Sequence, residues 1–340
     1  MIYTSLISAL EKAVNKAQEN SIERSLLFEN KELTRKHEFL LFIKPEITLK
    51  SSAINFSDIL ELILNKTEAF NLGIKNALLL PAEYLKAHDI IAQHYGVINA
   101  IARDAKKNLT KKAKKRFEEI FECEFALSPV YGGLEFLGKF SDITPSSLDY
   151  LWQNSPAVKL GGGAYAQRLK IDGEDVFLVN GFHPRQLEHF ISPGRSIIAF
   201  TLAGDLDWPA ARNKFIGKTN PADAEAGSIR RSLLEHKDRF GLQAVNSSWN
   251  GVHLSAGPVE GLVELIRYNS DFSSGEKLNY TGFEFGRQLS EVFDDKVIGK
   301  ILNNATVEFE GKPETVFDIT EEKNADNALQ ILKEVYDTTL

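Results

Sequence analysis

Cysteine is almost absent from the chain, which has 340 residues and a single thiol at Cys123. One cysteine cannot form an internal disulfide, and a zinc site built from four cysteines is excluded for the same reason. The sequence therefore gives no sign of an oxidising compartment.

Long apolar stretches are also lacking. The segment Met1–Asn20 mixes apolar residues with charged ones at helical spacing, which is not the pattern of a signal peptide. No run of about 18 apolar residues occurs, so no membrane span and no membrane partner are expected. The formal net charge is −7, so a general electrostatic affinity for nucleic acid is not expected either. We expect a cytoplasmic protein.

Short apolar runs and helical spacings predict an alternation of strands and helices. Strands are predicted at Phe39–Ile43, Ile74–Leu80, Ser196–Leu202 and Trp249–Ser255, and helices at Phe56–Phe70, Trp208–Gly217 and Pro258–Tyr268. With residues 96–178 set aside as an insertion, the core order is βαββαβ. This order predicts an α+β fold with a ferredoxin-like antiparallel sheet.

The predicted organisation has four parts. They are an N-terminal helical extension (1–36), a core (37–95 and 179–270), a large insertion (96–178) and a C-terminal extension (271–340). A lid is our hypothesis for the insertion. Within it, Lys106–Arg116 is interpreted as a solvated basic face, and Gly161–Gly163 lacks the lysine and hydroxyl residue of a phosphate-binding P-loop.

The strongest chemical pattern lies between Gly217 and Leu262. In order, it contains the runs Thr219-Asn220-Pro221-Ala222-Asp223, Gly227-Ser228-Ile229-Arg230 and Asn250-x-x-His253-x-Ser255. These runs, in this order, resemble the nucleoside diphosphate kinase family.

Three upstream pieces extend the resemblance. They are Phe42-Ile43-Lys44-Pro45-Glu46, His94-Tyr95 and Phe182-His183-Pro184. The resemblance covers residues 37–95 and 180–268, and leaves both ends and the insertion unexplained.

The resemblance implies transfer of the γ-phosphate of a nucleoside triphosphate to a nucleoside diphosphate through a phosphohistidine at His253. A covalent carrier divides such a transfer into two in-line steps at one site. Glu264 would fix the histidine tautomer by accepting a hydrogen bond from its far nitrogen. Lys44 and Arg230 would hold phosphate oxygens.

Further binding roles follow from the same resemblance. Thr219 would contact a phosphate, Tyr95 the transferring group, Asn250 the sugar and Phe182 the base. ATP and Mg²⁺ are the implied cofactors, with Mg²⁺ entering on the nucleotide rather than in a metal site of the protein. Nucleoside di- and triphosphates are the implied partners, and a homo-oligomer, guessed to be a dimer, is expected.

The chain departs from the family pattern at three places. Ala256 stands where the family has an acidic residue, Asn213 where it has an arginine (with Arg212 adjacent), and Asn180-Gly181 where it has Arg-Pro. These changes leave two alternatives open. One is a phosphohistidine phosphotransferase with a different acceptor, and the other is a nucleotide-binding regulatory protein without transfer.

Overall fold

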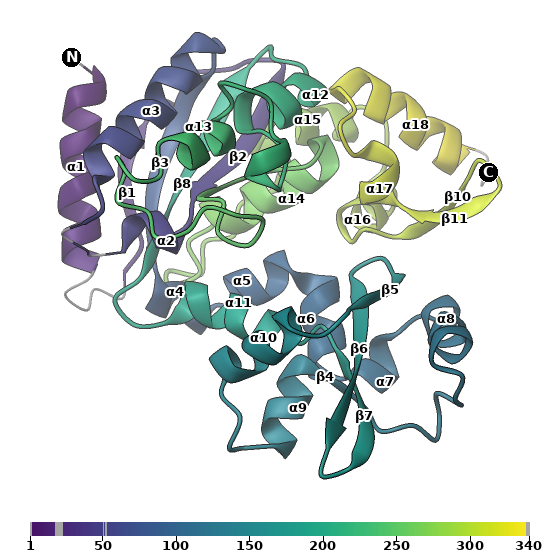
Figure 1. The fold of residues 1–340 in the computed structure, drawn as a ribbon. Helices are drawn as coiled ribbons and strands as arrows, with labels where there is room; N and C mark the ends of the chain where they lie inside the picture. Colours follow the sequence, from purple (N-terminus) through teal and green to yellow (C-terminus); the bar gives the residue numbers. More distant parts are fainter. Residues whose placement is uncertain (1, 18–22, 50, 52, 338–340) are drawn as a thin grey trace. The chain divides into compact units, whose positions relative to one another are not determined.

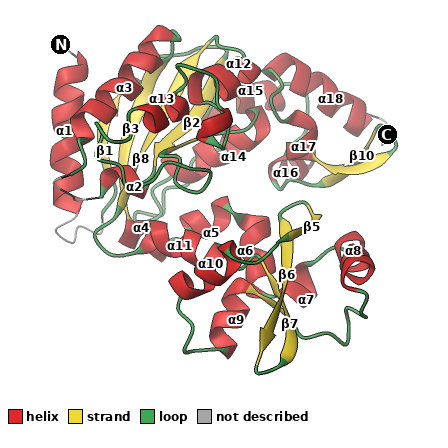
Figure 2. Ribbon diagram, in the orientation of Figure 1, coloured by secondary structure: helices red, strands yellow, loops and turns green. Residues whose placement is uncertain are grey.

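The computed structural model describes residues 2–17, 23–49, 51 and 53–337 (Figure 1). Contacts divide the chain into two compact units, Met1–Tyr84 with Pro193–Leu340 and Leu85–Ser192. Each unit combines helices with its own β-sheet, so the chain is an α+β protein (Figure 2).

The described residues of the first unit include five strands in one antiparallel sheet. The strand order is β1 (Ser25–Glu29), β3 (Gly73–Pro81), β8 (Ser196–Gly204), β2 (His37–Ile43) and β9 (Val252–Leu254). Every residue of β2 and β8 is buried, as expected for central strands that are covered on both faces. The four strands predicted from the sequence are all present.

The other elements of the first unit surround this sheet or follow it in the tail. They are α1 (Ile2–Ala17), α2 (Pro45–Thr48), α3 (Phe56–Ala69), α4 (Ala82–Ala87, which spans the unit boundary), α12 (Trp208–Ala210), a π-helical turn (Ala211–Ile216), 3-10 turns (Pro221–Asp223 and Tyr280–Gly282), α13 (Ile229–Glu235), α14 (Pro258–Asn269), α15 (Glu284–Ser290), α16 (Asp295–Leu302), the hairpin β10 (Thr306–Phe309) and β11 (Lys312–Thr315), α17 (Val316–Thr320) and α18 (Ala325–Asp337).

Side-chain alternation in β2 separates the two faces of the sheet. Phe39, Leu41 and Ile43 belong to the apolar cluster that also contains side chains of α1, α3 and α13. Phe42, which points to the opposite face, stacks on Tyr268 of α14 with ring centroids 5.5 Å apart. The side chains of β9 alternate in the same way, so this strand can present a residue toward α14.

The prediction of an entirely helical N-terminal extension was wrong. Helix α1 is present, but Ser25–Glu29 forms strand β1 and pairs with β3 at the sheet edge. Within β1, Leu26 is exposed and Leu27 and Phe28 are only half-buried. A short edge strand of this kind is specified by the neighbouring strand that it pairs with, and the local sequence gives little signal for it.

A glycine fixes the entry into β9. Gly251 has φ +77°, and a Cβ there would lie 2.6 Å from Leu233 Cδ1 and 2.8 Å from Ile47 Cδ1. Its carbonyl oxygen accepts a hydrogen bond from the Lys44 N–H at 2.8 Å. The chain therefore turns tightly at Gly251, and the end of β2 lies beside the start of β9.

The second unit holds four strands within its described residues, in the order β4 (Val130–Gly132), β7 (Glu174–Val179), β6 (Ala164–Ile171) and β5 (Val158–Gly161). Only the β4–β7 pair is parallel. Its helices are α5 (Ile90–His94), α6 (Gly96–Arg103), α7 (Ala105–Asn108), α8 (Lys111–Phe121), α9 (Gly133–Lys139), α10 (Pro145–Gln153) and α11 (His183–Ile191). The second unit, Leu85–Ser192, includes more residues at both ends than the predicted insertion 96–178.

No helix in the described part of the chain is both long enough and apolar enough to cross a membrane.

His37, the first residue of β2, makes folding sensitive to acid. Its side chain is buried, and burial lowers the pKa of His37 to about 4, with Lys36 acting in the same direction and Asp326, Asp207 and Asp205 opposing. The unfolded chain binds this proton near pH 6.5, so stability is lost as the pH falls from 6.5 toward 4. Between pH 7 and 5, this group costs about 2 kcal/mol. Urea unfolding at both pH values should show His37→Gln losing less stability than the native chain, and an equal loss would contradict the assignment.

Candidate functional site

His253 lies in the middle of β9 and faces α14. The neighbouring side chains, Val252 and Leu254, are fully buried in the apolar cluster on the other face of the sheet. His253 is paired with Phe42 of β2 in the sheet register. The two rings are stacked, with centroids 4.6 Å apart and planes at 20°. The imidazole is thus oriented by packing as well as by its strand.

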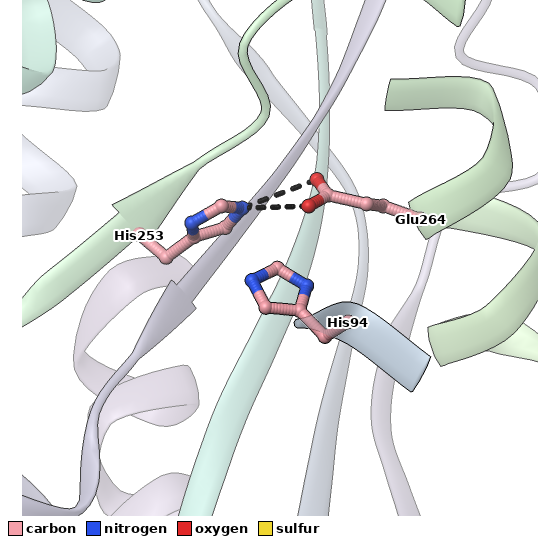
Figure 3. Close-up of side chains that lie close together, drawn as sticks. All are labelled: His94, His253 and Glu264. Atoms are coloured by element: carbon pink, nitrogen blue, oxygen red, sulfur yellow. Dashed lines mark hydrogen bonds and ion pairs between the residues drawn. The ribbon is translucent and has the colours of Figure 1, made fainter. Parts of the chain in front are cut away.

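Glu264 of α14 joins the histidine to its strand neighbour Ser255. His253 Nε2 lies 3.0 Å from Glu264 Oε1 and 3.1 Å from Oε2 (Figure 3). Ser255 Oγ donates to Glu264 Oε2 at 2.6 Å, and Ser255 and Glu264 are both buried. The Ser255 hydroxyl also accepts a hydrogen bond from the Leu40 N–H of β2 at 3.2 Å. Serine, histidine and glutamate therefore form one hydrogen-bonded network between the sheet and α14, in which the serine and glutamate are buried and the histidine is partly exposed.

This network determines which nitrogen of His253 is protonated. An ionised carboxylate can only accept hydrogen bonds, so Nε2 carries the proton and the lone pair of a neutral ring is on Nδ1. Burial lowers the pKa of His253, the Glu264 carboxylate opposes this effect, and Arg212 and Arg230 add to it. At neutral pH, the ring is consequently uncharged and suited to act as a nucleophile.

Lys44, Asn250 and Thr219 are linked by hydrogen bonds. Lys44 Nζ donates to Asn250 Oδ1 at 2.6 Å, and Asn250 Nδ2 donates to the Thr219 carbonyl oxygen at 3.0 Å. Burial lowers the pKa of Lys44 to about 8, with Arg230 acting in the same direction and Glu46 opposing. The contacts place the loop that follows Gly217 beside the ends of β2 and β9.

Arg230 of α13 is buried and tied to the backbone. Its Nη1 donates to the Gly217 carbonyl oxygen at 2.8 Å, and its Nη2 donates to the Val252 carbonyl oxygen at 3.0 Å. These bonds attach α13 to the loop start and to β9. Arg230 therefore has a structural role beside its charge, which the sequence did not indicate.

Arg212, and not Asn213, brings a positive charge to β9. Arg212 Nη1 donates to the Leu254 carbonyl oxygen at 2.9 Å, whereas the Asn213 side chain donates to the Pro209 carbonyl oxygen within its own turn. Arg212 lies in the π-helical turn Ala211–Ile216, which changes the direction of side chains relative to a regular helix. The sequence alone left this cation unassigned because its position depends on the irregular turn.

Tyr95 and Phe182 belong to the second unit. Tyr95 lies between α5 and α6, and its ring makes an edge contact with His183 at 6.2 Å between centroids. Phe182 precedes α11 and contacts Trp152 at 5.6 Å between centroids. Two groups of predicted site residues meet in the first unit: His253 with Glu264, and Lys44 with Asn250 and Thr219. Arg230 is hydrogen-bonded to the backbone of β9 at Val252.

Asn180, which stands where the family pattern has an arginine, has a structural function. It is buried, has φ +51°, and its side chain accepts from the Tyr165 N–H at 3.0 Å and donates to the Gly163 carbonyl oxygen at 2.8 Å. Asparagine tolerates this left-handed conformation better than most residues.

Comparison of the chain with protein-family models gives no match, and comparison with curated protein sequences gives none either.

Replacing Glu264 should lower the pKa of His253 further. Glu264→Gln removes the carboxylate that favours the protonated ring, while burial, Arg212 and Arg230 remain. The measurement is an NMR titration of the His253 ring protons. Glu260→Gln is the matched control on the same helix. Burial, together with Glu264, raises the pKa of Glu260 to about 8, so Glu260 carries no charge where His253 titrates. Equal shifts in both variants would contradict the electrostatic assignment.

Proposed function

We propose that the chain is a phosphotransferase of the nucleoside diphosphate kinase type, with Nδ1 of His253 as the atom that carries the phosphate. The observation that carries this proposal is the network of His253, Glu264 and Ser255. It fixes one tautomer of a neutral imidazole on a strand next to a half-buried lysine.

The strand order supports the predicted core. With β2, β3, β8 and β9 numbered one to four along the chain, their spatial order is four-one-three-two, and all neighbours are antiparallel. A ferredoxin-like βαββαβ unit has the same strand order, which supports our proposal of this fold for the core of the first unit. Strand β1 extends it at one edge.

The proposed reaction has two in-line steps. The Nδ1 lone pair forms a bond to the γ-phosphorus of a nucleoside triphosphate, the bond from that phosphorus to the bridging oxygen breaks, and the diphosphate leaves with the electron pair. A terminal oxygen of a second diphosphate then forms a bond to this phosphorus, and the bond from phosphorus to Nδ1 breaks. Its electron pair returns to Nδ1, so the ring is neutral again. Glu264 keeps the proton on Nε2 and stabilises the positive charge that the ring acquires.

Lys44, which is positioned by its hydrogen bond to Asn250, would attract and partly neutralise the negative charge of the phosphates. An ammonium group that is already held by a hydrogen bond loses little side-chain entropy on binding an anion. Asn250 and Thr219 would contact the sugar and a phosphate, as in the family that the sequence resembles. The proposal does not depend on Tyr95 or Phe182.

The residues around His253 are compatible with an Mg²⁺ ion that is bound by the nucleotide and not by the protein. Magnesium prefers oxygen ligands in octahedral geometry. Around His253, the Glu264 carboxylate is engaged by His253 and Ser255, and Glu46 Oε1 accepts from the Gly251 N–H at 2.9 Å. Carboxylates committed in this way do not form an oxygen cage. When bound, Mg²⁺ would neutralise phosphate charge.

A labelling experiment tests the proposal. Incubation with γ-labelled ATP and Mg²⁺ should give a phosphoprotein that survives alkali, is lost in acid and passes its label to added nucleoside diphosphates. His253→Ala should abolish the label, whereas His236→Ala, which removes an exposed histidine of the same unit, should retain it. Each step of transfer can be followed by scintillation counting.

Other outcomes select among the alternatives. Label that forms on His253 but passes to no diphosphate would indicate a different acceptor. Nucleotide binding without any label would indicate a binding protein, and label that persists in His253→Ala would refute the assignment of the nucleophile.

The affinity for nucleotides should fall at alkaline pH, because Lys44 then loses its charge. Because burial lowers the pKa of Lys44 to about 8, its charge is present below that pH and is lost above it. We expect the affinity for ADP to fall up to about tenfold between pH 7 and 9. Lys44→Arg should remove this fall, because arginine stays charged. Calorimetric titration is the measurement, and Lys218→Arg, at an exposed lysine, is the control that should still show the fall.

A further inference from the structure

The C-terminal extension reaches the loop that follows His253. The main-chain N–H of Glu322, which comes just after α17, donates to the Ala256 carbonyl oxygen at 2.9 Å. At Gly257, an added Cβ would lie 2.6 Å from the Thr320 carbonyl oxygen. Helix α17 also contacts α14 (Figure 1). The segment Thr320–Glu322, named the tail clasp here, is therefore packed directly against the β9–α14 loop.

The tail clasp presents two carboxylates to Arg212. Glu322 Oε1 lies 3.7 Å from Arg212 Nε, and Glu321 Oε1 lies 4.0 Å from Arg212 Nη2. The Nε atom is buried and donates no hydrogen bond within the described residues. Arg212 is thus hydrogen-bonded through Nη1 to Leu254 of β9, while its Nε and Nη2 atoms lie near the carboxylates of the tail clasp.

These two ion pairs are weak. Both distances exceed the 2.7–2.9 Å of a charge-assisted hydrogen bond. The Glu321 and Glu322 side chains are 51% and 40% exposed, so water screens the attraction. A guanidinium held in this way can exchange carboxylates for a phosphate group, which offers shorter bidentate hydrogen bonds.

The tail clasp also brings negative charge close to residue 256, where the family pattern has an acidic residue. The resemblance places an acidic residue at 256, where this chain has alanine, and Glu322 is bonded to the backbone of that residue. Glu260 is uncharged at neutral pH, because burial and Glu264 raise its pKa to about 8. The tail carboxylates of Glu321 and Glu322 both lie within 4.0 Å of the Arg212 guanidinium.

We propose that the tail clasp regulates the His253 site, with Glu321 and Glu322 competing against the phosphate groups of the nucleotide for Arg212. This inference rests on the proposed function. The closed clasp lowers the affinity for nucleotides, and displacement of the two carboxylates gives Arg212 to the incoming phosphate.

The test compares two pairs of substitutions with the same charge change. Glu321→Gln/Glu322→Gln removes both carboxylates but keeps the side-chain size and the main-chain bond to Ala256. Glu308→Gln/Glu310→Gln, at exposed positions in and just after β10, is the control. The clasp variant should bind ADP with Mg²⁺, and inorganic pyrophosphate, about three- to tenfold more tightly than the native chain. The control should not, and adding Arg212→Gln should abolish the gain.

A second measurement is independent of nucleotide. The rate at which phenylglyoxal modifies Arg212, followed by mass spectrometry, should rise several-fold in the clasp variant and stay constant in the control. If the chain binds no nucleotide and forms no label, but Arg212 becomes more reactive, the proposed function fails and the clasp stands. Unchanged reactivity together with unchanged affinity would overturn the clasp, and so would equal gains in both variants.

Discussion

The buried carboxylate of Glu264 constrains the arrangement of the whole site. A charge removed from water is costly unless hydrogen-bond donors surround it, and removing one partner of such a group costs more than the net value of the bond. Here the donors are Ser255 Oγ and His253 Nε2, which come from β9 and the residue that follows it. Helix α14 can therefore lie on the sheet in only one register relative to β9. Because β9 is also paired with β2, the same contact fixes the position of His253 relative to Lys44.

Two cations near this site, Lys44 and Arg230, are positioned by hydrogen bonds to neutral groups. Asn250 accepts from Lys44, and the Gly217 and Val252 carbonyl oxygens accept from Arg230. Carbonyl dipoles orient an ammonium or guanidinium group without cancelling its charge. The lowered pKa values of Lys44 and His253 follow from the same burial. A site built in this way keeps its electrostatic potential for an anionic ligand, and Arg212 lies within 4.0 Å of the Glu321 and Glu322 carboxylates.

The parts of the structure that the sequence predicted are those with strong local signals. The apolar runs at Phe39–Ile43 and Ser196–Leu202 correspond to central strands, in which burial on both faces requires continuous apolar residues. The pairing of His253 with Glu264 was predicted from resemblance, and the structure brings the two side chains within hydrogen-bond distance. Strand β1 was missed because its apolar run, Leu26–Phe28, is only three residues long and does not alternate with polar residues. The contact of Arg212 with Glu321 and Glu322 joins residues far apart in the chain through an irregular turn, and no spacing rule reports it.

The network around His253 bears on the choice between transfer and simple binding. A protein that only binds an anion is served by a charged imidazole, because a positive ring attracts phosphate. This chain instead buries the ring, which lowers its pKa, and gives Nε2 a carboxylate acceptor, which leaves the lone pair of the neutral ring on Nδ1. A neutral ring attracts anions less than a charged one, and its lone pair on Nδ1 is what the proposed transfer requires. Burying Glu264 to fix the tautomer carries a desolvation cost, and the transfer that we propose would give this arrangement a use.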